Sequence, residues 1–304
     1  MRIGFVFNPA ANKGRAQAIM ESLRKSVCQT DSSNWFITQR RGHAEELAEE
    51  LGGKGFERLV ALGGDGTIHE VVNGIMRLPP EKRPELAVVP VGSGNDFCFS
   101  LGVSMNPLEA LQQARKFPAK PVDVGWMRDN LGGSCYWVNV VGIGFDAVIN
   151  AHARTMPLVR GFLLYLVSTL KAIALNYTLF RLTGRRDEKD WQDTYLMYVI
   201  CNGRREGGGF HVAPDALIDD GKFHSVAVTP ISRPQMLATL PHFIKGTQFS
   251  LGYVKNGSFR HTEFYSDVPL PLHVDGELYA GLDSAIHHLE IRILPGILRV
   301  VHNH

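Results

Sequence analysis

The stretch LVALGGDGTIHEVVNGI, from Leu59 to Ile75, places an aspartate between glycines where an apolar run meets a helical pattern. Glycines let a backbone approach a phosphate closely, and the hydroxyl of Thr67 can donate a hydrogen bond to it. Asp65 would repel a phosphate unless a divalent cation or water lies between them, as phosphoryl-transfer sites require. The alternative is an Asp-Gly turn in which Thr67 begins the next helix. The residues of this stretch leave both interpretations open.

Two more loops combine small residues with polar donors, NPAANKGRA from Asn8 to Ala16 and GSGNDF from Gly92 to Phe97. Each follows a short apolar run, as GGDGT does. All three would therefore lie at the carboxyl ends of strands, where α/β sheets bind their ligands. The dinucleotide pattern G-x-G-x-x-G is absent from the first loop, and the P-loop pattern is absent from the whole sequence. The three loops favour an anion site of another kind.

The first part of the chain alternates short apolar strands with amphipathic helices. The expected strands are RIGFVF, WFIT, RLVAL and LAVVPV, which begin at Arg2, Trp35, Arg58 and Leu86. Apolar residues recur at helical spacing after the first three of them, in the sets Ala16, Ile19, Met20, Leu23 and Val27; Ala44, Leu47, Ala48 and Leu51; Ile68, Val71, Val72 and Ile75. This alternation predicts an α/β domain over residues 1–120, with a mainly parallel sheet and helices on both faces.

From about Pro121 the pattern changes to short apolar runs separated by Gly, Pro and Asp-Gly signals. The runs YWVNVVGIGF, YLMYVICN, DDGKFHSVAV, LPLHVDGELYA and HLEIRIL predict a mainly antiparallel β-sandwich over residues 121–304. Two helices interrupt this pattern, one from Pro157 to about Leu175 and one that begins near Pro234. The last residues of the chain could pack back on the first domain.

The composition of the 304 residues is typical of a globular protein, with 44% hydrophobic and 20% charged residues. The net charge of +2 gives no strong field, so we expect no nucleic-acid partner. The apolar segment Phe162 to Leu175 contains Lys171 and is too short to span a bilayer, and the N-terminus lacks an export pattern. We expect neither a disulfide nor a zinc site from the scattered cysteines and histidines, which include Cys28, Cys98, Cys135, Cys201, His43, His69, His211 and His273.

Together, the motifs NPAANKGRA, GGDGTIHEVVNGI and PVGSGNDFCFSLG resemble the catalytic domain of the diacylglycerol kinase family, in particular its soluble bacterial lipid kinases. Sphingosine and ceramide kinases are more distant relatives. The resemblance continues in order through PVDVG, VNVVGIGFDA, CNGRREGGGFHVAPDALIDDGKF and HVDGELY. It implies an NAD kinase/diacylglycerol kinase-like nucleotide domain followed by a β-sandwich. It also implies transfer of the γ-phosphate of ATP to a hydroxyl of diacylglycerol, phosphatidylglycerol or a similar lipid.

The resemblance also assigns nucleotide contacts to particular residues. Asn8, the loop from Lys13 to Arg15, and Thr38 would contact the nucleotide, although Thr38 could instead cap the next helix. The phosphates would be held by Gly63, Gly64, Asp65, Gly66, Thr67, Ile68, His69 and Ser93. Ser93 stands where the family usually has Thr, and it keeps the hydroxyl. Asn12 stands where many relatives have Gly, and Asn tolerates a left-handed backbone better than most residues.

Two Asp-Gly pairs in the second domain favour hairpins by themselves. In LIDDGKF the resemblance implies a structural Mg²⁺, bound by the Asp220 carboxylate and the main-chain carbonyls of Leu217 and Lys222. This ion would be separate from the Mg²⁺ that accompanies ATP. In HVDGEL the resemblance implies that Glu277 accepts the proton of the acceptor hydroxyl, and that Asp275 can share this role.

An acidic network is expected around Asp65, with Asp123 of PVDVG as a catalytic member and Asp96 of GNDF beside it. Asp96 could instead cap the following helix. A small-molecule kinase of the NAD kinase type is one rival function, and it predicts an Asn-Glu element where this chain has CNGRREGGG. A non-enzymatic nucleotide or lipid sensor is the other, and it predicts loss of the acids that this chain retains.

The helix that begins at Pro157 is the candidate lipid contact, because it carries more apolar residues than one packing stripe needs: Leu158, Phe162, Leu163, Tyr165, Leu166, Val167 and Leu170. Either the helix is buried on most sides, or part of its surface lines an acyl-chain cleft or meets a membrane. The basic pairs at Arg40, Arg185 and Arg204 are either ordinary solvated charge or contacts to anionic lipid. We expect a cytoplasmic protein, peripheral to the inner face of the membrane, and leave a homodimer open.

Overall fold

The computed structural model describes residues 1–26, 34–156, 159 and 161–302, and the chain divides into two compact units. The first unit comprises Met1–Val124 and the chain from Gly296 onward, and the second comprises Gly125–Pro295. Strands β5 (Ala119–Asp129) and β16 (His288–Val301) each contribute residues to both units. Some residues named above lie outside the described part of the chain: Val27, Cys28, Pro157 and Leu158.

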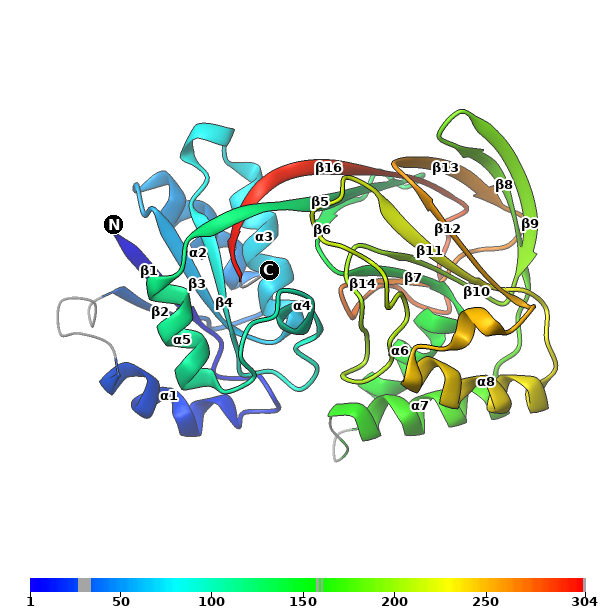
Figure 1. The fold of residues 1–304 in the computed structure, drawn as a ribbon, viewed down its shortest axis with the longest axis horizontal. Coiled ribbons are helices and arrows are strands. Elements are labelled where there is room, and N and C mark those ends of the chain that lie inside the picture. Colours follow the sequence, from blue (N-terminus) through cyan, green and yellow to red (C-terminus); the bar gives the residue numbers. More distant parts are fainter. Residues whose placement is uncertain (27–33, 157–158, 160, 303–304) are drawn as a thin grey trace. The chain divides into compact units, whose positions relative to one another are not determined.

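The sheet of the first unit is parallel and follows the order β2-β1-β3-β4, with the end of β16 beside β4 (Figure 1). Its strands are β1 (Ile3–Phe7), β2 (Trp35–Ile37), β3 (Arg58–Gly63) and β4 (Glu85–Pro90). The helices are α1 (Ala16–Lys25), α2 (His43–Gly53), α3 (Asp65–Arg77), α4 (Asp96–Ser100) and α5 (Pro107–Lys116). The predicted α/β fold of this part of the chain is confirmed.

Burial in the first unit follows the apolar pattern of the sequence. All residues of β1 and β3 are buried, as expected for parallel strands covered on both faces. On α3 the predicted stripe is fully buried, and it consists of Ile68, Val71, Val72 and Ile75. Burial of each such aliphatic side chain stabilises the fold by about 1.5–3 kcal/mol. This core fixes the strand ends from which the three polar loops leave.

The second unit is built on a sheet, called here the main sheet, with the antiparallel strand order β12-β11-β10-β7-β14-β15. Its strands are β7 (Val140–Gly144), β10 (Met197–Cys201), β11 (Phe223–Val228), β12 (Val254–Phe259), β14 (Leu272–Val274) and β15 (Glu277–Ala280). Further antiparallel ladders follow the order β16-β13-β8-β9, in which β13 spans His261–Ser266, β8 spans Phe180–Arg186 and β9 spans Lys189–Tyr195. Strand β6 (Ser134–Trp137) pairs with β5. One apolar cluster, which includes Trp137, Tyr198 and Phe264, joins both sets of strands, so the predicted β-sandwich is confirmed.

Among the described residues, three helices lie along one face of the main sheet (Figure 1): α6 (Phe145–Arg154), α7 (Gly161–Leu175) and α8 (Arg233–Lys245). A second apolar cluster, which includes Ile173, Met236 and Phe243, joins them to the sheet. The sequence predicted α7 and α8 but assigned Phe145 to a strand. That assignment is wrong because Gly144 has a φ of 75°, a left-handed conformation that ends β7 and lets α6 begin at the next residue.

Candidate functional site

Side-chain hydrogen bonds join the three polar loops of the first unit. Asn8, after β1, donates from Nδ2 to Oγ1 of Thr67 at 2.9 Å. Asp65 accepts at Oδ1 from the backbone N–H of Phe97 at 3.1 Å. Helix α3 begins at Asp65, so the expectation that Thr67 begins it is wrong by two residues. The loops that follow β1, β3 and β4 are therefore in contact, as their common position at strand ends predicted.

Unusual backbone features shape these loops. A Cβ atom on Gly92 would lie 2.2 Å from Cα of Gly64, so the second and third loops touch through their backbones. In the first loop Asn12 and Lys13 have φ of 51° and 55°, in the left-handed region. Asn12 therefore adopts the left-handed conformation that Asn was predicted to tolerate at this position. Ser93 is exposed in the third loop.

Asp65 and Asp96 both face Gly94, because a Cβ atom there would lie 3.0 Å from Oδ2 of each carboxylate. Asp96 is the first residue of α4 and the preceding residue occupies the N-cap, so the capping alternative for Asp96 is wrong.

Asp123, on β5, is 1% exposed and accepts a hydrogen bond from the N–H of Gly296 at 2.7 Å. This bond ties β5 to β16. The participation of Asp123 in an acidic network with Asp65 stays a prediction.

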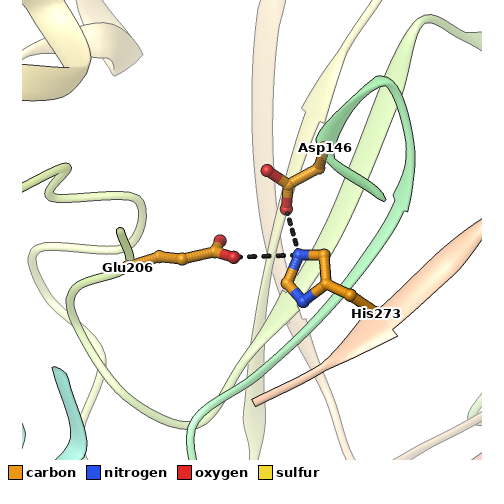
Figure 2. Close-up of side chains that lie close together, drawn as sticks. All are labelled: Asp146, Glu206 and His273. Atoms are coloured by element: carbon orange, nitrogen blue, oxygen red, sulfur yellow. Dashed lines mark hydrogen bonds and ion pairs between the residues drawn. The ribbon is translucent and has the colours of Figure 1, made fainter. Parts of the chain in front are cut away.

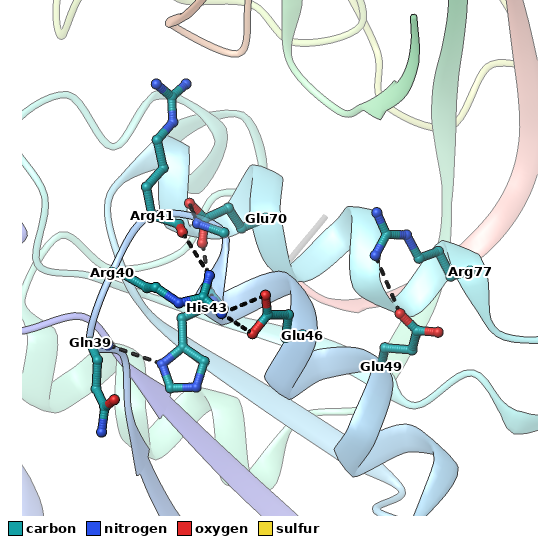
Figure 3. Close-up of polar contacts among 10 residues, drawn as sticks. Gln39, Arg40, Arg41, His43, Glu46, Glu49, Glu70 and Arg77 are labelled. Atoms are coloured by element: carbon teal, nitrogen blue, oxygen red, sulfur yellow. Dashed lines mark hydrogen bonds and ion pairs between the residues drawn. The ribbon is translucent and has the colours of Figure 1, made fainter.

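Thr38 is buried, and its N–H donates to the carbonyl of Phe7 at 2.9 Å. It does not cap α2, because Gly42 is the N-cap of that helix. The start of α2 is held instead by the carboxylate of Glu70, which accepts from the N–H groups of Gly42 at 2.8 Å and Ala44 at 3.1 Å (Figure 3). A carboxylate at a helix N-terminus is favoured by the helix dipole. Thr38 directly follows β2 and is hydrogen-bonded to Phe7 at the end of β1.

The first arginine of each basic pair has a partner within the chain. Arg40 lies 2.6 Å from Glu46 (Figure 3), and this hydrogen bond lowers the pKa of the exposed Glu46 carboxyl. Arg185 lies 3.4 Å from Asp190, and Arg204 donates to the carbonyl of Ala216 at 2.8 Å. These contacts are those of ordinary structural charge.

The proposed magnesium segment forms a turn before β11 rather than a hairpin. Oδ1 of Asp220 accepts from the backbone N–H of Lys222 at 3.2 Å. Its Oδ2 atom lies 3.6 Å from the Lys222 ammonium and 3.4 Å from Nε2 of His224. The Asp220 carboxylate is a suitable ligand for a divalent cation. The cation would compete for this carboxylate with the Lys222 ammonium and the His224 ring. Leu217, whose carbonyl is the third predicted ligand, is exposed. The ion itself stays a prediction.

The Asp-Gly pair of HVDGEL is a tight hairpin turn, as its local sequence predicted. Asp275 and Gly276 have φ of 49° and 78° and connect β14 directly to β15, as in a type I′ turn. The Asp275 carboxylate is 3% exposed and accepts backbone hydrogen bonds from Val138 at 3.2 Å, Asn139 at 2.8 Å and Val140 at 3.1 Å. These charge-assisted bonds give Asp275 a structural role in holding the turn against the residues that precede and begin β7.

Helix α6, which the sequence analysis missed, carries three polar residues at four-residue spacing that contact the β14–β15 hairpin. Asn150 donates to the carbonyl of Gly276 at 2.6 Å, and Arg154 lies 2.5 Å from Oε2 of Glu277. Asp146 contacts His273 on β14 at 3.0 Å. Residues four apart share one face of a helix, and this spacing in FDAVINAHAR was the available signal. The side chain of Glu277 is 36% exposed, so it can reach a ligand in solution or at a surface.

An apolar pocket lies within the second unit between α6, α7, α8 and the main sheet. Its cavity volume is about 80 Å³, and its lining includes Phe145, Tyr165, Phe210, Met236 and Phe243. Helix α7 buries one face and exposes another, where Leu163, Val167 and Leu170 are 58%, 36% and 44% exposed. One face of this helix is exposed and the rest is buried or half-buried, so both interpretations of the helix stay open. Within the described residues, none of the helices has the length and hydrophobicity that crossing a membrane requires.

Three titratable side chains meet beside this pocket, and Figure 2 shows both carboxylates pointing at the same ring nitrogen. Nε2 of His273 lies 3.0 Å from Oδ2 of Asp146 and 2.8 Å from Oε1 of Glu206. Burial alone would lower the pKa of His273, but the charges of Glu206 and Asp146 raise it well above its usual value. Burial and the same two carboxylates raise the pKa of the nearby Cys201 thiol. Sequence spacing could not reveal this cluster, since its members come from three distant segments.

Comparisons with protein families and with individual proteins identify the same family. The Diacylglycerol kinase catalytic domain family matches residues 2–127, and the YegS C-terminal NAD kinase beta sandwich-like domain family matches residues 139–302. A Chromohalobacter salexigens protein named "Probable lipid kinase YegS-like" is 35% identical over 79% of this chain and 76% of its own. "Putative lipid kinase YtlR" of Bacillus subtilis is 31% identical over 90% of this chain and 92% of its own.

A solved structure supports the same fold. The crystal structure of a "putative diacylglycerol kinase" from Bacillus anthracis str. Sterne covers 99% of this chain and 95% of its own, with a TM-score of 0.78 and 22% sequence identity. An α/β domain with joined glycine loops, followed by a β-sandwich, is the architecture of a kinase class. The chain belongs to the diacylglycerol kinase family, with a YegS-type C-terminal domain.

Proposed function

We propose that this kinase transfers the γ-phosphate of ATP to a hydroxyl of a membrane lipid of the diacylglycerol or phosphatidylglycerol type. The observation that carries the proposal is the contact of three small-residue loops around Asp65 at the ends of parallel strands. Close backbone approach and available N–H groups suit the phosphates of a nucleotide. A carboxylate in such a place suits phosphoryl transfer with a divalent cation.

In this proposal the first unit binds the nucleotide through Asn8, Lys13 and Thr38. Its phosphates contact the segment from Gly63 to His69 and the hydroxyl of Ser93. Asp65 would hold the Mg²⁺ of MgATP, with Asp123 as a supporting acid. The ion neutralises charge on the transferred group. The residues fit this task because the two carboxylates that face Gly94 offer the oxygen ligands that Mg²⁺ prefers.

The acceptor hydroxyl is assigned to Glu277, which we propose takes its proton. The Glu277 carboxylate is partly exposed, and α6 holds it through Arg154 while Asn150 fixes the preceding turn. Asp275 is assigned to positioning, because its oxygens already accept backbone hydrogen bonds. A proton acceptor must reach within about 3 Å of the hydroxyl that it activates.

The lipid is assigned to the second unit. Its apolar pocket offers a wall for acyl chains, since most of the residues that line it are hydrophobic. The exposed apolar face of α7 would rest on the inner surface of the membrane, where single exposed leucines gain from burial among acyl chains. A structural Mg²⁺ at Asp220 would brace the turn before β11.

The direct test is transfer of labelled phosphate from ATP to a panel of lipids in mixed micelles, with NAD as a competing acceptor. We expect label in a hydroxyl lipid and none in NAD. Loss of the proton acceptor in Glu277→Gln should lower kcat about 100-fold or more. Loss of the proposed metal ligand in Asp65→Asn should also abolish most transfer.

The matched control is Glu263→Gln, which removes a carboxylate that pairs with His288 on β16 in the same unit. It should leave transfer within about twofold, as is usual for a surface pair. Label in NAD alone would support the NAD kinase rival, and no transfer to any acceptor would support the sensor. Equal loss in Glu263→Gln and Glu277→Gln would contradict the role of Glu277.

A further inference from the structure

We propose that Asp146, Glu206 and His273 bind a first-row divalent cation, Zn²⁺ or Mn²⁺, inside the second unit. Two carboxylate oxygens and one imidazole nitrogen are ligands that both ions accept. Mg²⁺ prefers oxygen ligands and keeps several waters, so this site differs in chemistry from the one at Asp220. The inference goes beyond the kinase reaction, and its consequence for Glu277 rests on the proposed function.

The ligand atoms converge on one point. All three lie within 4.8 Å of one another, and both carboxylates approach the same Nε2 atom of His273, at 2.8 and 3.0 Å (Figure 2). A ring nitrogen carries one proton or one lone pair, so it cannot donate two full-strength hydrogen bonds. Ligands at right angles on one ion, with bonds of about 2.0–2.2 Å, lie about 3 Å apart. The two nitrogen–oxygen separations suit ligands of one ion, whereas one shared proton would leave at least one of the two contacts weak.

Charge favours the same conclusion. The side chains of Asp146, Glu206 and His273 are 13%, 10% and 0% exposed, so water screens them poorly. A proton on the ring leaves these three groups with one net negative charge next to an apolar pocket, which is costly to bury. A divalent cation with a neutral imidazole cancels both carboxylates.

Gly142 on β7 keeps the convergence point open. A Cβ atom at this position would lie 2.1 Å from Oδ2 of Asp146 and 2.2 Å from Nε2 of His273. The φ of Gly142 is not in the left-handed region, so backbone conformation does not require glycine here. Glycine is required at this position because the two ligand atoms leave no room for a side chain.

A bound ion would cross-link three segments that the chain brings together. Asp146 lies in the first turn of α6, His273 lies on β14, and Glu206 lies in the segment between β10 and β11. The same helix fixes the turn at Gly276 and contacts Glu277. The ion would therefore hold the hairpin that carries the proposed proton acceptor. It would act as a structural ion without touching the reacting atoms.

The test measures metal directly, without nucleotide or lipid, so that it is independent of kinase activity. The full chain, free of any histidine tag, is stripped with EDTA, dialysed against ZnCl₂ or MnCl₂ and washed through a desalting column. Elemental analysis should find about one ion per chain, and the ion should raise Tm. In Glu206→Gln and His273→Gln the retained metal should fall at least about tenfold.

The matched control is His288→Gln, because Nε2 of His288 pairs with one carboxylate, that of Glu263, at 2.9 Å. It should retain the ion, as should Asp220→Asn. Wild-type protein that retains no Zn²⁺ or Mn²⁺, or equal retention in Glu206→Gln and wild type, would overturn the proposal. If His273→Gln fails to fold, wild type and Glu206→Gln still decide, since Gln keeps the size and hydrogen-bonding capacity of Glu.

Discussion

The loop at Asp65 and the turn at Asp275 share an Asp-Gly pair, yet the structure uses the two aspartates differently. Asp65 begins α3 and is half-buried, with one oxygen on the N–H of Phe97 in the neighbouring loop. Asp275 adopts a left-handed conformation, is 3% exposed and accepts three backbone hydrogen bonds. A dipeptide alone therefore does not distinguish a site carboxylate from a structural one.

The difference comes from what surrounds each pair. Near Asp65 the glycines allow loops to meet, and the loops are held by their contacts with one another. Near Asp275 the turn joins β14 to β15. The Asp275 carboxylate accepts hydrogen bonds from the N–H groups of the residues that precede and begin β7. Asp275 therefore serves stability, and the role of Asp65 in the reaction stays a prediction. The residue after the turn, Glu277, keeps the exposure that Asp275 lacks.

Gly92→Ala should have the largest effect, because it breaks the contact between loops. The added Cβ would lie 2.2 Å from Cα of Gly64, so the backbones must separate. We expect nucleotide affinity to fall at least about 100-fold, since displacement of about 1 Å at a reaction site has effects of this size. Equilibrium binding of a nucleotide analogue measures the change.

Gly53→Ala is the control for this loss, because a Cβ at Gly53, at the end of α2, meets no atom within 4 Å. It should bind nucleotide as wild type does. Equal binding by Gly92→Ala and wild type would show that contact of the two loops is not needed for the site.

Asp275→Asn should have the next largest effect, on stability. It removes the negative charge that accepts backbone hydrogen bonds from Asn139 and Val140, and it leaves at least one N–H poorly satisfied. We expect the free energy of opening at β14 and β15 to fall by about 2–4 kcal/mol. Hydrogen exchange of the backbone amides in these strands measures it.

Asp65→Asn tests the other half of this comparison. It should change the opening free energy of the first unit by less than about 1 kcal/mol, because the amide oxygen can still accept the hydrogen bond from Phe97. A large loss of stability in this variant, together with none in Asp275→Asn, would reverse the assignment of the two aspartates.

Leu163→Glu should have the smallest effect, and it tests whether lipid contact belongs to the second unit. Leu163 is 58% exposed on α7, so a charge there should not disturb the core. We expect binding to anionic vesicles to weaken about tenfold, because a buried leucine gains about 1–2 kcal/mol at a membrane. Vesicle sedimentation measures this, while nucleotide affinity should stay unchanged.

Leu131→Glu is the matched control, since Leu131 is 63% exposed in the turn between β5 and β6. Equal weakening of vesicle binding in the two variants would mean that added negative charge alone causes the effect. Unchanged binding in both would contradict membrane contact through α7.

The sequence by itself determined the α/β and β-sandwich classes and the three polar loops. It could do so because apolar periodicity, glycine and the ends of strands are properties of contiguous residues. The stripe from Ile68 to Ile75 and the turn at Asp275 and Gly276 are read this way, and both are observed. The hydrophobic pattern also found α7 and α8.

Only the tertiary structure decided which groups meet. It placed Asp146, Glu206 and His273 on one point, and it buried Asp275 while leaving Glu277 partly exposed. It also showed that α6 follows the left-handed Gly144 where a strand was expected. Although α6 had a local signal in its four-residue spacing, the cluster and the burial of Asp275 depend on contacts between residues far apart in the chain. Local spacing carries no record of them, because burial and charge are set by the neighbours that folding brings together.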